Sequence, residues 1–341
     1  MNKYLRNAAF LFGVTLSFVC GPALSQKLTV AEPGRLFQYS PLYFAVEKGY
    51  FKQEGLDVSI LSVGRRDLAM KAVIQGQAFA SVHDPVEASL AKSRGADVKL
   101  IAPVVNVAAL WLTVDKDITL DSKSWRGKRI AIPTPPNTIN SIFLKELREN
   151  GWVEVDRTTY KMKGDDDPSR YLRILYGAFG TELALMMNGQ ANMTVALEPT
   201  ASVLVVKAGR HIIKDYPAVI GRFLNSTINV TAETIKNDRA TVTKFINALT
   251  KAYRYAAKHP DELEQVALKW FPNTDPTVMR AAIQRMIKAG SFPADTIFTK
   301  ESYYKNLEYL GLGEPNHSAL QIKFEDIADT SFAEAASKAY Q

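Results

Sequence analysis

Cysteine is almost missing from this chain of 341 residues, because Cys20 is its single example. One thiol excludes an internal disulfide and a zinc site built from several thiolates. Cys20 also lies in a segment that we expect to be removed, so the mature chain would have no cysteine nucleophile. The four histidines are too dispersed along the sequence to form a cluster. We therefore expect no metal and no cofactor.

The signature motifs of common enzymes are missing as well. G-x-S-x-G, H-E-x-x-H, C-x-x-C and G-x-x-x-x-G-K do not occur, which removes the usual hydrolase, zinc and nucleotide signals. The acidic run 165–167 lacks the spaced ligands of a calcium loop. Lysine and arginine exceed the acidic residues by only 42 to 35 and are scattered along the chain. We expect neither an enzyme nor a nucleic-acid-binding protein.

The first 25 residues have the pattern of a secretory signal peptide. Lys3 and Arg6 precede an uncharged run over 7–19, and small residues occupy the two positions that a signal peptidase reads before Gln26. We predict cleavage before Gln26 and a periplasmic location. A membrane anchor is the weaker alternative, because the apolar run is shorter than the roughly 20 residues that span a bilayer. A lipid anchor at Cys20 is disfavoured, because no small residue stands directly before it.

The rest of the chain repeats one unit, which is a short apolar strand, a polar loop and an amphipathic helix that ends near glycine. Strands expected over 28–30, 58–61 and 79–82 begin three such units, and the pattern starts again at 128–132. Alternating strands and helices favour right-handed crossovers and largely parallel sheets. We predict an α/β fold with two similar Rossmann-like lobes.

The order of these units also predicts the limits of the lobes. We expect a second lobe over 109–225 and a discontinuous first lobe over 26–108 and 226–341, because a strand at 226–230 returns the chain to the first. Helices and one late strand complete the prediction: helices over 41–53, 232–258, 261–270, 276–289 and 331–340, and a strand-like stretch over 321–324.

Polar loops follow the predicted strands in both lobes. In open α/β sheets, ligands bind beyond the carboxyl ends of the strands, where helix N-termini present unpaired N–H groups. Two lobes that face each other would form a cleft from these loops. The loops carry Gln, Tyr, Arg, His, Asp, Thr, Asn and Glu side chains, which suit a small polar ligand.

Four segments carry a resemblance to a known family. They are 41–56 (PLYFAVEKGYFKQEGL), 72–77 (AVIQGQ), 125–132 (WRGKRIAI) and 185–190 (LMMNGQ), the last of which precedes a strand over 194–197 that leads to Glu198. In this order, they resemble periplasmic solute-binding proteins of the nitrate/sulfonate/taurine and thiamine-precursor group (SsuA/THI5-like, NMT1-like). The resemblance covers nearly all of the chain after residue 25.

This resemblance implies a fold, partners and a site. The fold would be the type II periplasmic binding protein fold, with two lobes that are joined by a two-strand hinge and close on a small molecule. The partners would be an ABC permease and its cytoplasmic ATPase, and we expect the chain to be a monomer. The implied ligand-binding residues, to which we add Trp111 near the crossover between the lobes, are Gln38, Tyr39, Arg65, Arg66, His83, Asp84, Thr134, Asn137, Thr138, Thr181 and Glu198.

These residues leave two ligand classes open. Arg65 and Arg66 stand at a helix start, where cations oppose the helix dipole, and this favours contact with an anion such as a sulfonate, a taurine-like solute or an aromatic carboxylate. Asp84, Glu198 and Tyr39 would instead suit a thiamine pyrimidine precursor or another nitrogen-bearing ring. We rank the anion first.

Structural roles compete with ligand contact at several of these positions. Asp84, Asn137 and Thr138 fit helix caps, and His83 and Trp111 fit core packing. A periplasmic sensor subunit would use the same fold. The family is also similar to a fungal enzyme that builds the thiamine pyrimidine, but that chemistry is associated with a cysteine-rich iron motif, which the mature chain lacks.

Overall fold

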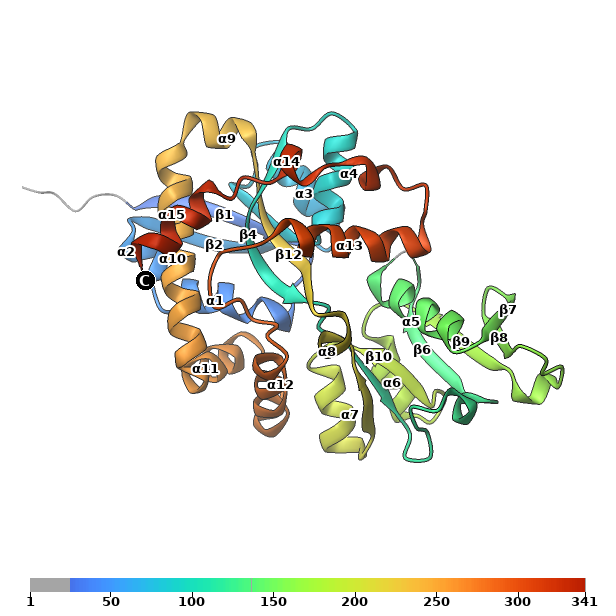
Figure 1. Ribbon diagram of the computed structural model, residues 1–341. Coiled ribbons are helices and arrows are strands. Elements are labelled where there is room, and N and C mark those ends of the chain that lie inside the picture. Colours follow the sequence, from blue (N-terminus) through green and yellow to red (C-terminus); the bar gives the residue numbers. More distant parts are fainter. Residues whose placement is uncertain (1–24, 136, 341) are drawn as a thin grey trace, which may run out of the picture.

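The computed structural model describes residues 25–135 and 137–340. The predicted signal peptide therefore lies outside the described residues, except for its last position. Two β-sheets, each covered by helices, form two lobes that meet along a narrow waist (Figure 1). We call lobe 1 the part built on β1–β4 and β12 with the C-terminal helices, and lobe 2 the part built on β5–β11.

The sheet of lobe 1 has five strands in the order β2-β1-β3-β12-β4. β1 is parallel to both β2 and β3, as the strand–helix alternation predicts, whereas β12 is antiparallel to β3 and β4. The antiparallel pairing arises because β4 leaves lobe 1 and β12 returns to it. The strands are β1 Gln26–Glu32, β2 Leu56–Ser62, β3 Ala80–His83, β4 Val98–Val107 and β12 Arg222–Thr231.

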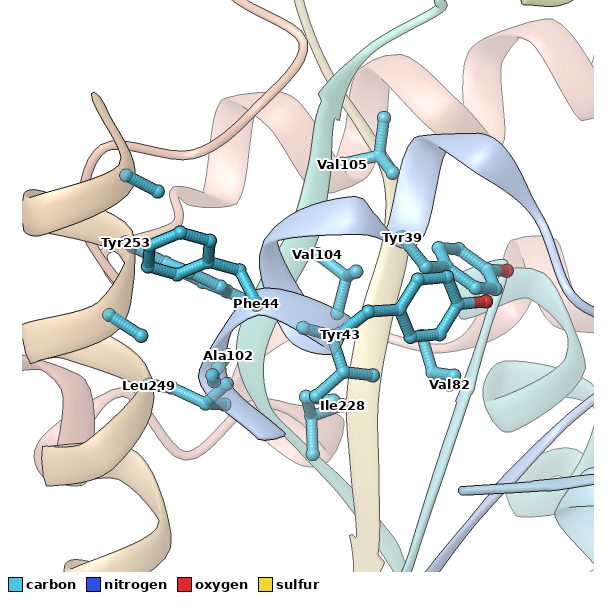
Figure 2. Packing of buried hydrophobic residues seen from close by; sticks show 14 of the residues in the cluster. Tyr39, Tyr43, Phe44, Val82, Ala102, Val104, Val105, Ile228, Leu249 and Tyr253 are labelled. Atoms are coloured by element: carbon cyan, nitrogen blue, oxygen red, sulfur yellow. The ribbon is translucent and has the colours of Figure 1, made fainter. Parts of the chain in front are cut away.

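Helices cover both faces of this sheet. The helix predicted over 41–53 divides in two, because Gly49 adopts φ +73°, a left-handed conformation that glycine tolerates best. Figure 2 shows the apolar core on one face, where Phe44 of α1 lies between the sheet and Tyr253 of α10. The helices around this sheet are α1 Ser40–Glu47, α2 Tyr50–Gln53, α3 Arg66–Ile74, α4 Pro85–Ser93, α9 Ala232–Asn237 and α10 Arg239–Lys258.

Lobe 2 has a mixed sheet of seven strands in the order β11-β5-β10-β6-β9-β8-β7. Only the central strands β10, β6 and β9 are parallel neighbours, so this sheet is less parallel than the sequence pattern predicts. The hairpin β7–β8 and the edge strand β11 account for part of the difference. The strands are β5 Trp111–Val114, β6 Arg129–Pro133, β7 Trp152–Asp156, β8 Thr159–Met162, β9 Leu172–Gly177, β10 Met193–Ala196 and β11 His211–Asp215.

The helices of lobe 2 follow its parallel strands. α5 Thr138–Glu149 follows β6, α6 Thr181–Met187 follows β9, and α7 Thr200–Ala208 follows β10. The short α8 Tyr216–Ile220 leads the chain back towards lobe 1. The N-termini of α5 and α6 therefore lie beyond the carboxyl ends of strands, as the prediction of a cleft requires.

Two neighbouring strands connect the lobes. β4 runs out of lobe 1 towards β5, and β12 runs back beside it, with Arg222 paired to Val107 near the crossing (Figure 1). The type II periplasmic binding protein fold with a two-strand hinge is thus present. The lobe limits at 108/109 and 225/226 stay a prediction.

The C-terminal segment differs most from the sequence pattern. The helix predicted over 232–258 breaks, because the side chain of Asp238 accepts a hydrogen bond from the Thr241 N–H (3.2 Å) and caps α10. The strand predicted over 321–324 is wrong, since His317 caps a 3-10 turn over 318–321 and α14 begins at Phe324. The other helices of this segment are α11 Pro260–Trp270, α12 Pro276–Lys288, α13 Lys300–Gly313, α14 Phe324–Ile327 and α15 Ser331–Ala339.

Candidate functional site

A cavity of about 630 Å³ lies between the two lobes at the hinge. Lobe 1 lines it with the loops that follow β1 and β2 and with the start of α4. Lobe 2 lines it with the start of α5, the loop before α6 and the end of β10. Residues of both crossing segments, Leu110 and Ser226 among them, form part of its wall. The cavity therefore has the position that the fold predicts for a ligand.

The structure brings together some of the predicted site residues and not others. Those that line the cavity are Gln38, Tyr39, Arg65, Arg66, Asp84, Asn137 and Thr138. Those that lie outside it are His83, Trp111, Thr134, Thr181 and Glu198.

The two adjacent arginines have different surroundings. Arg65 precedes α3, and its guanidinium donates two hydrogen bonds to the Asp67 carboxylate, at 2.9 and 2.7 Å. Its side chain is 71% exposed, so this pair is a surface ion pair at the rim. Arg66 is the first residue of α3 and is half-buried in the cavity wall. Within the described part of the chain, Arg66 has no carboxylate at ion-pair distance and no hydrogen-bond partner, so its guanidinium is available to an anion.

Two carboxyl groups, those of Asp84 and Glu87, face the same cavity as Arg66. Asp84 caps α4 by accepting a hydrogen bond from the Val86 N–H (2.9 Å), and it also accepts one from Asn306 Nδ2 (3.3 Å). Burial raises the pKa of Asp84 and of Glu87 above their ordinary values, while the charge of Arg66 opposes the shift in both. The cavity thus combines one guanidinium with two acids whose ionised forms are disfavoured by burial.

One wall of the cavity is apolar, and its residues are not among the predicted site residues. They are Leu36, Leu110, Ile139, Phe179 and Leu197. Phe179 is 54% exposed, although it is a large aromatic side chain, and it stands at the start of α6 on the lobe 2 side. Apolar side chains at such positions are expected to pack in a core, so the sequence pattern does not distinguish them from core residues.

Two further polar residues have defined roles in the wall. Tyr39 is buried, with its hydroxyl 3.4 Å from Ser226 Oγ of the crossing strand β12. Asn137 caps α5, because its Oδ1 accepts a hydrogen bond from the Asn140 N–H (3.1 Å). The capping role expected for Asn137 is confirmed, and the residue still lines the cavity.

The residues outside the cavity have structural partners. Glu198 is buried and accepts hydrogen bonds from Ser202 and from Arg285 of α12, a helix of lobe 1. Trp111 is 1% exposed and packs in the core that both lobes share. Thr134 and Thr181 are exposed and donate their hydroxyl hydrogen bonds to backbone carbonyls.

His83 is fully buried on β3, directly beside the cavity wall. Nδ1 lies 2.9 Å from the Asp84 carbonyl oxygen and Nε2 lies 3.0 Å from Ser81 Oγ, which fits a neutral ring that donates from Nδ1 and accepts at Nε2. Burial lowers the pKa of His83 to about 4. The ring is therefore neutral in the folded protein at neutral pH.

We expect His83 to make folding sensitive to acid. Because its pKa falls from about 6.5 in the unfolded chain to about 4 in the folded one, the stabilisation is complete above pH 6.5 and is lost as the pH falls towards 4. The loss should reach about 3 kcal/mol of unfolding free energy. Urea unfolding at several pH values should show a weaker acid loss for His83→Gln than for the wild type. The exposed His211→Gln is the control, and equal slopes in all three proteins would contradict this assignment.

Residues 25–135 and 137–340 contain neither a cluster of metal ligands nor a helix that could span a membrane. Three or more His, Cys, Asp or Glu side chains do not gather there in a way that could hold a metal ion. In the same residues, the helices are too short or too polar to cross a membrane.

The sequence of this chain is similar to a known protein family and to a binding protein of Bacillus subtilis. The sequence model described as NMT1/THI5 like matches residues 36–263. YtlA of Bacillus subtilis (strain 168), which is named as a candidate binding protein, is 24% identical over 317 residues, which span 89% of this chain and 90% of YtlA.

Solved structures show the same fold. A protein of Bordetella bronchiseptica RB50 matches with a TM-score of 0.70 and 20% identity, covering 92% of this chain and 98% of that one. The periplasmic aliphatic sulphonate-binding protein SsuA of Escherichia coli matches with a TM-score of 0.67 and 13% identity, over 88% and 91%. The periplasmic nitrate-binding protein NrtA of Synechocystis PCC 6803 matches with a TM-score of 0.65 and 12% identity, over 93% and 89%.

An enzyme is also among the relatives. A 4-amino-5-hydroxymethyl-2-methylpyrimidine phosphate synthase of Candida albicans (strain WO-1) is 26% identical over 238 residues. The match spans 65% of this chain but only 64% of the synthase.

Proposed function

This chain belongs to the NMT1/THI5-like family, and from that premise we propose that it is the periplasmic solute-binding component of an ABC importer. The cavity at the hinge supports the proposal, because both lobes contribute to its wall and rotation about β4 and β12 would change its width. A ligand that contacts both lobes would favour the closed form, which the permease would then recognise. The likeness in fold to SsuA and NrtA, which are named as periplasmic binding proteins, is in keeping with this role.

We propose a small organic anion with an apolar body as the solute. Arg66 carries this proposal, because its guanidinium is half-buried in the cavity and lacks a partner among the described residues. A sulfonate or carboxylate would accept its hydrogen bonds, and the apolar part would lie against Leu110, Leu197 and Phe179. Aromatic carboxylates and alkanesulfonates have this combination of groups.

A nitrogen-bearing ring such as an aminopyrimidine is the second candidate. Asp84 supports it, because a buried carboxyl group in the wall could accept hydrogen bonds from a ring amine. The same Asp84 already accepts hydrogen bonds from Val86 and Asn306, which limits what remains for a ligand. We therefore keep the anion first.

We propose a binding role rather than catalysis for this chain. The synthase relative matches over only part of its own length, and the predicted mature chain has no cysteine for the iron motif expected of such enzymes. The alternative binding role is that of a periplasmic sensor subunit with the same fold. Neighbouring genes for a permease and an ATPase would favour the importer over the sensor.

The melting temperature of residues 26–341 tests the proposed solute. The protein should be unfolded and refolded to remove carried-over ligand, and then scanned with benzoates, phenylpropanoates, alkanesulfonates, nitrate and aminopyrimidines. A ligand at roughly 100 times its dissociation constant should add about 2.7 kcal/mol to the unfolding free energy. Saturable stabilisation by organic anions alone is the expected result. Stabilisation by aminopyrimidines alone would replace the anion with the second candidate.

A further inference from the structure

A second cavity of about 290 Å³ adjoins the cleft. We call it the annex. The two cavities share the wall residues Arg66, Asp84, Glu87, Asn137 and Thr138, so the annex continues the cleft rather than lying apart from it. Its remaining polar wall is formed by Asn140 and Ser141 of α5, Asn306 of α13, and Glu314 and His317 after α13.

Helix α13 contributes residues to the wall of the annex and packs on both lobes (Figure 1). Tyr303 and Leu307 of this helix lie in a core of lobe 1, and Tyr309 lies in the core of lobe 2. The helix ends so close to α5 that a Cβ atom on Gly313 would stand 2.8 Å from Ser141 Oγ. Close packing on both sides makes the annex a defined compartment.

One hydrogen-bond acceptor of the annex residues, on Asn140, is unpaired within the described chain. Asn140 is 2% exposed, and its Nδ2 donates to the Pro133 carbonyl oxygen, which fixes the orientation of the amide. Its Oδ1 is buried without a hydrogen-bond partner among the described residues. A buried acceptor without a partner costs free energy, which a donor from a ligand would recover.

The charged side chains of the annex wall also favour a ligand that donates hydrogen bonds. Asp84, Glu87 and Glu314 contribute carboxyl groups, and Arg66 is the one lysine or arginine among the described residues that line the annex. His317 Nδ1 accepts a hydrogen bond from the Ala319 N–H, and its Nε2 lies 3.8 Å from a carboxylate oxygen of Glu314. The compartment is thus suited to a cation or to a group rich in N–H donors.

We propose that the annex receives an amine-bearing arm of the solute. Arg66 lies in the wall of both cavities, so an anionic group bound to it would stand where the apolar cleft and the acceptor-lined annex meet. The solute would then carry a carboxylate or sulfonate with an apolar body on one side and an ammonium or amine on the other. This inference rests on the proposed function and narrows its solute class to amphoteric organic anions.

Matched pairs of probes test the annex by calorimetry on residues 26–341. One pair is L-phenylalanine and 2-methyl-3-phenylpropanoate, and the other is 4-amino-2-benzylbutanoate and 2-benzylpentanoate. Within each pair, an ammonium group replaces a methyl group of similar size. We expect the amine of at least one pair to bind about tenfold more tightly than its partner, in line with a hydrogen bond to a charged group. The parent 3-phenylpropanoate, which has no arm, reports on the cleft alone.

Two variants assign the preference to the annex. Glu314→Gln removes a carboxylate that lines the annex but not the cleft, and it should reduce the preference for the amine to under about threefold without changing the affinity for 3-phenylpropanoate. Glu308→Gln removes an exposed carboxylate on α13 that pairs with Lys305 and should keep the preference. Glu87→Gln, which changes the wall of both cavities, should lower the same preference when it is measured as the ratio of affinities within each pair.

Each outcome decides between this inference and the function on which it rests. Binding of 3-phenylpropanoate with equal or weaker binding of both amines would overturn the annex proposal and leave the anion-binding role intact. An amine preference that survives both Glu87→Gln and Glu314→Gln would also overturn it. Failure of 3-phenylpropanoate and of every organic anion in the melting scan would instead overturn the proposed solute class, and the annex proposal with it.

Discussion

Replacing Arg66 with alanine should weaken binding of the organic anion by about 1.5–3 kcal/mol, which is roughly 10–150-fold in the dissociation constant. The guanidinium is half-buried in the cavity wall and has no carboxylate partner among the described residues, so the anion would be its main interaction. The melting temperature of the ligand-free protein should change little, since no folded-state hydrogen bond of the described chain is lost. Titration calorimetry with the tightest anion from the melting scan provides the measurement.

Arg65→Ala is the matched control for this prediction. Arg65 has the same charge and stands one residue away, but its guanidinium pairs with Asp67 at 2.7 Å and its side chain is 71% exposed. We expect its removal to change the dissociation constant by less than about fivefold, because an exposed ion pair contributes little. Equal losses in the two variants would mean that general positive charge at the rim, rather than one positioned guanidinium, attracts the anion.

The largest loss of stability should come from Arg285, which does not line the anion site. Arg285→Ala is expected to lower the unfolding free energy by about 3–5 kcal/mol, because it leaves the Glu198 carboxylate buried without its cation. The side chain of Glu198 is 1% exposed, and Arg285 also donates a hydrogen bond to Ser202 Oγ (2.7 Å). Urea unfolding of the ligand-free protein measures the loss.

Two controls test whether the loss of stability arises from the buried charge of Glu198. Lys207 of α7 and Asp275, which directly precedes α12, form an exposed ion pair (2.6 Å). Lys207→Ala should lower the unfolding free energy by less than about 1 kcal/mol. The double variant Arg285→Met with Glu198→Leu removes both charges and should recover much of the loss. A cost for Arg285→Ala as small as that of Lys207→Ala would show that water reaches and solvates Glu198.

This ion pair also shows why the sequence could not assign Glu198. Its place after a predicted strand and before Pro199 is the place of a cleft residue, and local pattern supplies no other information. Its actual partner, Arg285, is 87 residues away along the chain and belongs to lobe 1. Only the packing of α12 on α7 decides that Glu198 points to the other lobe. Arg65 and Arg66 are a second case, since only the structure shows that Asp67 pairs with one of them.

Other parts of the fold were predictable, because local physics determines them. The strand–helix units of lobe 1, the caps at Asp84 and Asn137, and the return strand near 226–230 follow from apolar periodicity and capping residues. The sequence pattern does not predict helix α13 or the annex. The polar residues of the annex come from α4, α5 and α13, which approach one another only in the folded chain.

The position of β12 in lobe 1 has a consequence for the order in which the protein folds. β12 lies between β3 and β4, yet residues 108–221 separate it from the end of β4 in the chain. The sheet of lobe 1 lacks an interior strand until β12 has joined it. The strands of lobe 2 are continuous in sequence and can pair first. We therefore expect lobe 1 to complete its folding last, because the pairing of β12 with β4 closes the loop over residues 108–221.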